Sequence, residues 1–537
     1  MRYSGRSRAK PQEPAIFNII RERTRPLVFW PPAALLLVAL AFSIIDYAGF
    51  YAAVSAANAW LLSRFDWLYS FASFAAVILV VWVAISPIGS VRIGGPTATP
   101  ILSRWNWFAI TLCTTVAIGI LFWGAAEPMI HINNPPAFSG AEVHSEAAAH
   151  FAISTLFMHW TITPYALYSV PALAFALAHF NLGRPYSLSG PLSLIFGRAA
   201  TGRGGALIDA IGLYALVAGV AASLGVGVMT LAGGIERLTP ADDGVWLRLF
   251  ITIAIVSVFV ASSITGIQRG IKILSDINVK FFFALALFLL LLGPTGAILS
   301  LGASALSDYV VHFVPASLAL GERAGSQWMR DWTVFYFANW LAWAPITALF
   351  LGRIAVGYTV REFLLFNLLL PAAFGALWMT IFGGAAIEAD ASGALTAALN
   401  ERGPEAVIYA LFDAFPLAAL IASGFVVLTF ISFVTAMDSN THSIAAVCLK
   451  PAKSARDERR SAMPVKIFWG ALVGAVAWVM TSTTGIEGVR MLSNLGGAPG
   501  LLILVFMGAV IITMRINWLD EIRAGAQPAT STEAKAR

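Results

Sequence analysis

The chain has 537 residues, of which 58% are hydrophobic and only 12% are charged. Its mean hydropathy of +0.78 is far from a soluble globular balance, so the composition indicates an integral membrane protein. The formal net charge of +6 is then a matter of membrane topology, and it does not indicate a nucleic-acid partner.

Apolar runs long enough to cross a bilayer recur along the whole chain. Most of the 34 Lys and Arg residues fall on the connections that share a side with the N-terminus, which is the positive-inside pattern. The sequence therefore predicts a multi-pass protein of the cell inner (plasma) membrane with both termini in the cytoplasm. The twelve predicted spans are 28–50, 67–88, 106–130, 147–180, 206–234, 245–265, 277–300, 332–352, 363–387, 415–448, 465–484 and 494–514.

Polar tails flank this region. Residues 1–26 and 516–537 are predicted to be cytoplasmic tails around a twelve-helix domain at 27–515. The first apolar run is of full spanning length and follows a long polar leader, so we expect a retained span and not a cleavable signal. A short helix or re-entrant piece is expected at 404–415. The chain has no P-loop motif, so it carries no ATP-driven motor of its own.

The third predicted span has the composition of a broken helix. It reads ITLCTTVAIGILFWGAAEPM, and the small and hydroxylated residues Thr114, Thr115 and Gly119 predict a region where the helix unwinds and offers backbone carbonyls to a ligand. Close helix packing is an equally simple explanation for the glycine. Glu127 lies near the outer end of the span, where a carboxylate pairs, titrates, lines a vestibule or is simply solvated.

The fourth span contains the motif HWTITPYALY, which includes Trp160, Pro164, Tyr165 and Tyr168. The proline frees backbone groups and bends the helix, while Tyr165 and Tyr168 share one helix face. Such aromatics serve either in packing or as walls of a binding site. A second aromatic span facing them would favour the binding site.

That second span lies at residues 333–357, TVFYFANWLAWAPITALFLGRIAVG. Trp340 and Trp343 are three residues apart and share a helix face near mid-span, well away from the charged residues Asp331 and Arg353. Indoles usually sit at the membrane–water boundary, where the N–H reaches water. Aromatic faces buried this deep are suited to a cation without protons to donate, so they indicate transport of a quaternary-ammonium compound.

Two further segments carry candidate coupling groups. Arg269 lies in the connection 263–275, at the inner mouth of the seventh span. Thr435 lies near the inner end of the tenth span in FVTAMDSNTHS, where its hydroxyl could ligate an ion or bond back to a helix carbonyl.

Together these segments resemble the betaine/choline/carnitine transporter (BCCT) family over nearly the whole chain. WTVFYFANWLAWAPITALFLGRIAVGYTVREF is similar to the signature of the family's eighth span. ILFWGAAEP, HWTITPY and FVTAMDS are similar to its patterns in spans 3, 4 and 10.

The resemblance implies an all-α fold of twelve transmembrane helices. Two peripheral helices would precede two inverted five-helix repeats (LeuT-like) at about 105–300 and 330–515, with alternating access and a homotrimer. It also implies an aromatic box for a small quaternary-ammonium substrate, in which Asn339 and Tyr165 stand where many members have Trp. The implied substrate residues are Trp160, Tyr165, Tyr168, Phe337, Asn339, Trp340 and Trp343.

The sodium-binding pattern of the family is incomplete here. The Gly-x-Gly-x-Gly positions of the sodium-driven members are Thr115, Ala117 and Gly119, and their Thr-Ser pair is Thr435-Ala436. Thr114-Thr115 is instead similar to the carnitine-exchanger branch, where a basic side chain replaces the ion, and Arg269 is our candidate by position. We expect exchange without an ion gradient, with sodium symport and proton symport as alternatives.

Three rival functions remain at this point. The first is transport of another zwitterion on the same fold, such as a neutral amino acid or a sulfonium compound. The second is a channel or substrate-gated sensor. The third, an enzyme, is not expected, because the seven His residues show no metal-like spacing beyond His144 and His150, and no cofactor is predicted.

Overall fold

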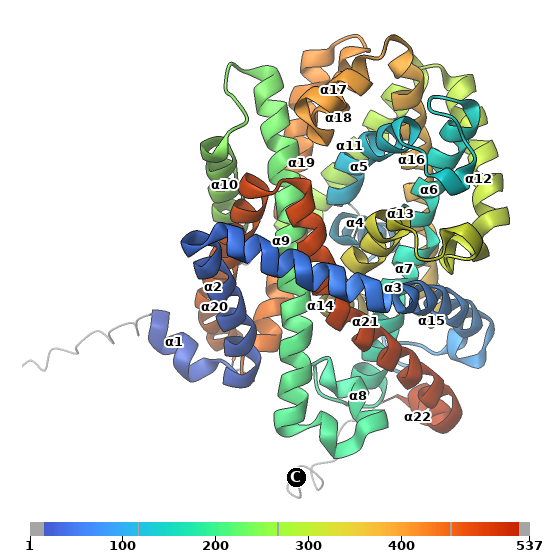
Figure 1. Cartoon of the computed structure of the whole chain (residues 1–537). Helices are drawn as coiled ribbons and strands as arrows, with labels where there is room; N and C mark the ends of the chain where they lie inside the picture. Colours follow the sequence, from blue (N-terminus) through green and yellow to red (C-terminus); the bar gives the residue numbers. More distant parts are fainter. Residues whose placement is uncertain (1–15, 116, 266–267, 452–453, 526–537) are drawn as a thin grey trace, which may run out of the picture.

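The computed structural model describes residues 16–115, 117–265, 268–451 and 454–525, and these are almost entirely helical (Figure 1). Within these ranges extended pairing is limited to two single bridges, Thr24 with Leu449 and Arg92 with Thr359. The α-helices are α1 (Ile16–Arg23), α2 (Pro26–Ile45), α3 (Tyr47–Ile85), α4 (Arg104–Thr115), α5 (Ala117–Asn133), α6 (Glu146–Trp160), α7 (Ile162–Ala176), α8 (Ser189–Phe196), α9 (Gly202–Leu238), α10 (Val245–Thr265), α11 (Gln268–Leu292), α12 (Thr295–Ser317), α13 (Gln327–Met329), α14 (Phe335–Ile354), α15 (Val360–Leu364), α16 (Leu370–Ala389), α17 (Ala394–Arg402), α18 (Pro404–Asp413), α19 (Ala418–Cys448), α20 (Ala455–Thr483), α21 (Ile486–Asn517) and α22 (Leu519–Ala524).

The helices have the length and composition of membrane spans. Ten in the described ranges are long and apolar enough to cross a bilayer, or up to twelve if each of two bent pairs counts as one span. Many large apolar side chains on α2, α3 and α11 face outward, as lipid contact requires. The predicted all-helical membrane class is confirmed, while the count of twelve spans stays a prediction.

The region predicted as the seventh span differs from the prediction. Residues 277–300 are not one helix, because α11 ends at Leu292 and α12 begins at Thr295. Pro294 between them has no N–H to donate and disfavours a helical residue before it, which favours the helix end seen here. The second helix, α12, packs against α6 and α16. The short helix expected at 404–415 is present as α18.

Close backbone packing fixes the centre of the molecule. Helix α9 has 37 residues, about 55 Å at 1.5 Å per residue, and runs through the height of the molecule in green in Figure 1. Helix α14 packs against α7, α9 and α21. A Cβ at Gly497 would lie 2.3 Å from the Ala338 carbonyl oxygen, and one at Gly500 would lie 2.1 Å from that of Leu341. Only glycine allows α21 to approach α14 this closely, and this contact sets the depth of the α14 tryptophans.

The start of the described chain is tied to the helix bundle by one arginine. The Arg25 guanidinium donates to the Asp209 carboxylate of α9 at 2.6 Å and to the Val447 carbonyl at 3.0 Å. The Asp209 side chain is fully buried, and its second oxygen accepts from the Ser189 N–H at 3.1 Å. Arg25 is therefore the charge partner that makes the burial of this carboxylate tolerable.

We expect Arg25→Ala to lower the free energy of unfolding by about 3 kcal/mol, because it leaves a buried carboxylate without its counter-charge. The measurement is the thermal unfolding midpoint of the detergent-purified chain. Arg237→Ala is the matched control, since Arg237 and Asp413 form a largely exposed pair. Equal midpoints for the two variants would contradict the assignment.

Candidate functional site

Two helices break at mid-bundle and open the site. The axis turns by 55° between Arg104–Thr115 and Gly119–Asn133, and by 60° between Gln327–Pro345 and Thr347–Ile354. A bent or unwound helix frees backbone groups and makes room for side chains, which is how transporters build mid-membrane sites. A cavity of about 40 Å³ lies at these breaks. Its lining residues are Cys113, Thr114, Thr115, Gly119, Trp160, Tyr168, Ser223, Asn339, Trp340, Trp343 and Ala436.

Aromatic rings form adjoining walls around Trp340. The Trp340 ring centroid lies 5.4 Å from that of Trp160 and 5.5 Å from that of Tyr168, with interplanar angles of 79° and 78°. The Tyr165 ring is 6.1 Å away and tilted. Rings that meet at nearly right angles are the adjacent sides of a box, so one cation in the corner would face more than one π surface.

The indole N–H groups of Trp160, Trp340 and Trp343 all form hydrogen bonds, and these bonds do not occupy the ring faces. Trp340 donates to the His159 carbonyl at 3.0 Å, and Trp343 donates to the Ser223 hydroxyl at 2.9 Å. Trp160 donates to the Glu127 carboxylate at 2.9 Å. Each wall is therefore anchored by a hydrogen bond to another helix, which leaves the ring faces for the cavity.

Polar groups also reach the cavity. The Asn339 amide oxygen accepts from the Ser493 hydroxyl at 3.0 Å, which leaves the amide N–H groups to donate. The Thr114 hydroxyl is buried and has no hydrogen-bond partner within the described part of the chain. These two donors, one from each bent helix, suit an anionic or hydroxylated group beside the aromatic walls.

Of the predicted residues, three do not line the cavity, and the side chain of a fourth lies outside the described residues. Phe337 is fully buried in α14 but does not line the cavity, and Tyr165 approaches it only through its contact with Trp340. The Thr435 hydroxyl bonds back to the Ile431 carbonyl at 2.8 Å, while its neighbour Ala436 lines the cavity. Arg269 falls in the first turn of α11, and its side chain lies outside the described residues. The roles assigned to all the predicted site residues remain predictions.

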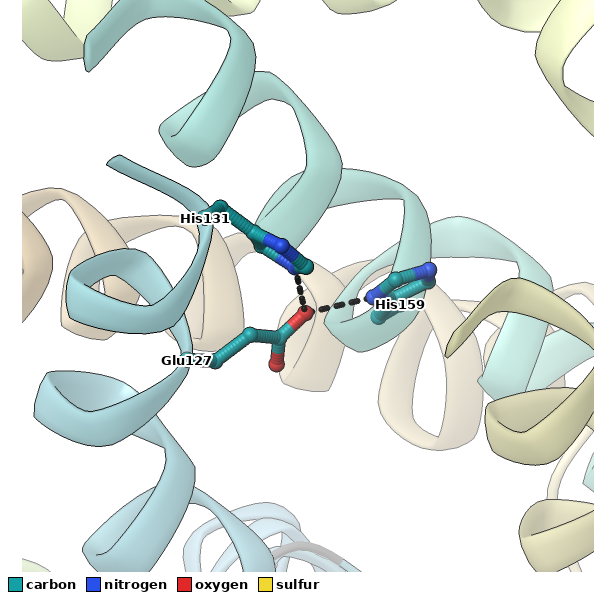
Figure 2. Close-up of side chains that lie close together, drawn as sticks. All are labelled: Glu127, His131 and His159. Atoms are coloured by element: carbon teal, nitrogen blue, oxygen red, sulfur yellow. Dashed lines mark hydrogen bonds and ion pairs between the residues drawn. The ribbon is translucent and has the colours of Figure 1, made fainter. Parts of the chain in front are cut away.

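A buried cluster next to the box was missed at the sequence level. Glu127 and His131 on α5 and His159 on α6 are fully buried, and both imidazoles point at one carboxylate oxygen in Figure 2. Their donor atoms lie within 4.8 Å of one another, close enough to share a proton or surround a small ion. Our inspection of His spacing found only the loop pair His144 and His150. The signal it missed was the Glu127–His131 spacing of four residues, which places both on one helix face.

The chain matches a known transporter family. The BCCT family model, betaine/carnitine/choline family transporter, matches residues 27–517. The chain is 30% identical over 488 residues to the glycine betaine transporter OpuD of Bacillus subtilis (strain 168), covering 89% of this chain and 92% of that protein. It is 30% identical to the ectoine/hydroxyectoine transporter of Virgibacillus pantothenticus, covering 84% and 88%. It is 31% identical to glycine betaine transporter 1 of Vibrio parahaemolyticus serotype O3:K6 (strain RIMD 2210633), covering 80% and 82%.

The fold also matches a solved transporter. A Na⁺-coupled sialic acid symporter, solved in a substrate-bound outward-open state, aligns with a TM-score of 0.50 at 12% sequence identity. The alignment covers 82% of this chain and 85% of that one. At this identity the likeness concerns the fold alone.

The contact between Gly119 and Trp160 gives a test of the box geometry. A Cβ at Gly119 would lie 2.2 Å from Cη2 of Trp160, so Gly119→Ala must push the ring out of place. We expect a loss of about 1–3 kcal/mol, the usual cost of overpacking, seen as a lower thermal unfolding midpoint in detergent. Gly296→Ala on α12 is the control, because a Cβ there meets nothing within 4 Å. A midpoint at or above that of the unmodified chain would argue against the packed ring.

Proposed function

We propose that this chain, which belongs to the betaine/carnitine/choline transporter family, carries quaternary-ammonium solutes across the membrane through the aromatic cavity. The family and the relatives named above are transporters, so the chain is a transporter and not an enzyme. Relatives from two genera are named as glycine betaine transporters, which supports this substrate class.

The observation that carries the proposal is the composition of the cavity wall. Trp160, Tyr168 and Trp340 present ring faces at nearly right angles. No Asp or Glu stands among the described residues that line the cavity. A primary ammonium carries N–H donors that need strong acceptors in a buried site, whereas a trimethylammonium group has none and is held well by π faces.

The opposite end of the solute would meet Thr114 and Asn339. Both can donate a hydrogen bond toward the cavity, and a bond to a carboxylate is worth more than one to a neutral group. A zwitterion such as betaine, with a methylated cation at one end and a carboxylate at the other, matches this distribution of groups.

The architecture we propose is the family's alternating-access bundle. The two bent helix pairs would be corresponding helices of two inverted five-helix repeats, at about 105–300 and 330–515, within a domain of twelve spans. We place both termini, with tails at 1–26 and 516–537, in the cytoplasm and the domain in the plasma membrane. This rests on the Lys/Arg distribution and on the two breaks, one between α4 and α5 and one within α14 after Pro345. A homotrimer is proposed from the family resemblance.

A second candidate substrate is a different zwitterion on the same fold. One relative is named as an ectoine/hydroxyectoine transporter, so a related protein serves a zwitterion whose cationic group is not a quaternary ammonium. Competition distinguishes the two candidates: an excess of tetramethylammonium would block uptake of betaine or choline but leave uptake of an amino acid or ectoine unchanged.

The mode of coupling is a separate proposal. Exchange without an ion gradient, with Arg269 as a fixed positive charge, rests on the sequence resemblance. Counterflow in proteoliposomes tests it: uptake that requires internal substrate and ignores a sodium gradient would support exchange. Uptake that scales with the sodium gradient and does not depend on internal substrate would contradict the exchange proposal.

The most direct test of the function is substrate binding to the purified chain. Titration with betaine, choline, carnitine and tetramethylammonium should quench tryptophan fluorescence, because several indoles line the cavity. Saturable quenching by these solutes, together with their uptake into proteoliposomes, is the expected result. The proposal fails if none of them binds or moves.

Trp340 should contribute more to binding than any other ring, since it adjoins three others. We expect Trp340→Ala to weaken binding by about 2 kcal/mol, about thirtyfold, through loss of one desolvated cation–π wall. Trp340→Phe should keep much of the affinity, because it retains a π face. Equal affinities for the Ala and Phe variants would show that the ring face is not the contact.

Asn339 gives a test of the polar end. We expect Asn339→Ala to weaken betaine binding by about tenfold, the cost of one hydrogen bond to a charged group. Tetramethylammonium has no polar end and should bind the variant as it binds the unmodified chain. Parallel fluorescence titrations provide the comparison, and equal losses for both solutes would place Asn339 away from the carboxylate.

A further inference from the structure

The buried acid–imidazole cluster adjoins two cavities of similar volume: Trp160, which bonds Glu127, lines the aromatic cavity, and His159 lines a second cavity. We propose that Glu127, His131 and His159 form a proton-binding site, and that a bound proton and a cationic solute compete to neutralise the Glu127 carboxylate. The inference deepens the proposed function and rests on it, because it needs a cation in the aromatic cavity.

The Glu127 carboxylate has polar partners at both of its oxygens. One oxygen lies 2.5 Å from Nδ1 of His159 and 3.5 Å from Nε2 of His131, as the dashed lines in Figure 2 mark. The other oxygen accepts from the Tyr336 hydroxyl at 2.5 Å and from the Trp160 indole at 2.9 Å. Three hydrogen-bond contacts and a second imidazole close by favour the anionic carboxylate, so the bundle must supply a positive charge nearby.

His159 can hold that charge without any rearrangement. Its Nδ1 faces Glu127, and its Nε2 lies 3.1 Å from the Thr333 hydroxyl. A hydroxyl both donates and accepts, so Thr333 accepts from an imidazolium and donates to a neutral imidazole. The same atoms therefore satisfy both protonation states, as a reversible proton site requires.

His131 is a second place for the proton. Neither of its ring nitrogens has a hydrogen-bond partner in the described chain, although the side chain is fully buried. Its ring centroid lies 4.4 Å from that of Trp332 and 5.2 Å from that of Trp328. An imidazolium here would face indole rings and pair with Glu127.

The other charged groups around the cluster have partners of their own, so they do not supply the positive charge that Glu127 needs. Arg490 of α21 stacks over Trp332 at 4.5 Å and bonds Glu487 at 2.9 Å, so it has its own acidic partner. Asp331 lies on the same element as Thr333 and accepts from the Gln327 amide at 2.8 Å. The remaining neighbour on α14, Tyr336, is neutral when it donates to Glu127.

A path for protons reaches His159 from the side that we place outside. A cavity of about 40 Å³, enough for water, has His159 and Thr333 among its lining residues. Asp308, His312 and Arg323 also line it, and Asp308 and His312 form a partly exposed pair. Water in this cavity would connect the imidazole to charged groups at the surface.

The link to the solute runs through Trp160, which touches both partners. Its indole N–H bonds Glu127, while the same side chain lines the solute cavity. With one imidazolium the cluster is neutral. If that proton leaves to water, the net charge of the cluster is −1, and a quaternary ammonium bound against Trp160 compensates it. Charges about 10 Å apart in a protein interior change each other's binding about tenfold.

The geometry favours a proton over a metal ion. Ligand atoms around one divalent ion with bonds of about 2.0–2.2 Å stand roughly 3.3 Å apart in a tetrahedral shell. The contact of 2.5 Å between Glu127 and His159 is a hydrogen-bond distance and leaves no room for an ion between them.

The experiment compares choline, with a net charge of +1, and betaine, with a net charge of zero. Fluorescence titrations of the purified full chain from pH 5.5 to 8.5 should show choline affinity rising about tenfold with pH, and betaine affinity changing much less. In a weakly buffered solution with a pH dye, choline binding should release protons. Glu127→Gln should abolish both the pH dependence and the proton release, and His131→Gln should reduce them.

The chain offers a matched control. Glu146 and His150 form the same pair at the same spacing of four residues, but Glu146 is 89% exposed. Glu146→Gln with His150→Gln should keep the wild-type pH dependence.

Each other outcome has a defined meaning. Choline binding without proton release and with constant affinity would overturn the proton site and leave the proposed function standing, as would a Glu127→Gln variant that retains the pH dependence. One equivalent of divalent metal in the purified chain, lost in Glu127→Gln, would overturn it in favour of a metal centre. If neither solute binds at any pH, the proposed function itself fails.

Discussion

The arrangement of the aromatic cavity depends on one buried carboxylate. Glu127 of α5 accepts hydrogen bonds from side chains on two other helices, Trp160 of α6 and Tyr336 of α14. A carboxylate inside a membrane bundle is tolerated only when donors surround it, so α5, α6 and α14 must meet at this point. The same contact sets the orientation of the Trp160 ring, and with it one wall of the cavity. Glu127 therefore both joins three helices and orients one ring of the cavity wall.

Close backbone contact supplies the second constraint. Gly497 and Gly500 let α21 approach the carbonyl groups of α14, while Gly119 leaves room for the Trp160 ring. Small residues permit this approach in a bundle where lipid removes the usual hydrophobic drive for helix association. The tryptophans of α14 consequently have fixed depth and direction, and their N–H groups find partners on other helices. The π faces are what remain for a ligand.

The sequence pointed to side chains that the structure places around one cavity, but it did not reveal the cluster beside that cavity. Trp160, Tyr168, Asn339, Trp340 and Trp343, all proposed from the aromatic spans and the family resemblance, line one cavity. The cluster escaped notice because His159 is 32 residues from Glu127 in the chain and only packing brings them together. The span predicted at 277–300 failed for a local reason: apolar composition continues through Gly293-Pro294, but the helix does not.

Composition and charge distribution determined the class of this protein, and its motifs indicated the family and the aromatic side chains that we propose for the site. Those properties are local, because hydropathy, helix faces and motifs are written in neighbouring residues. The tertiary structure decided which ring faces meet, which hydroxyls remain without partners, and which buried acid faces two imidazoles. These depend on where helices cross and bend, and that is set by contacts between residues far apart in the chain.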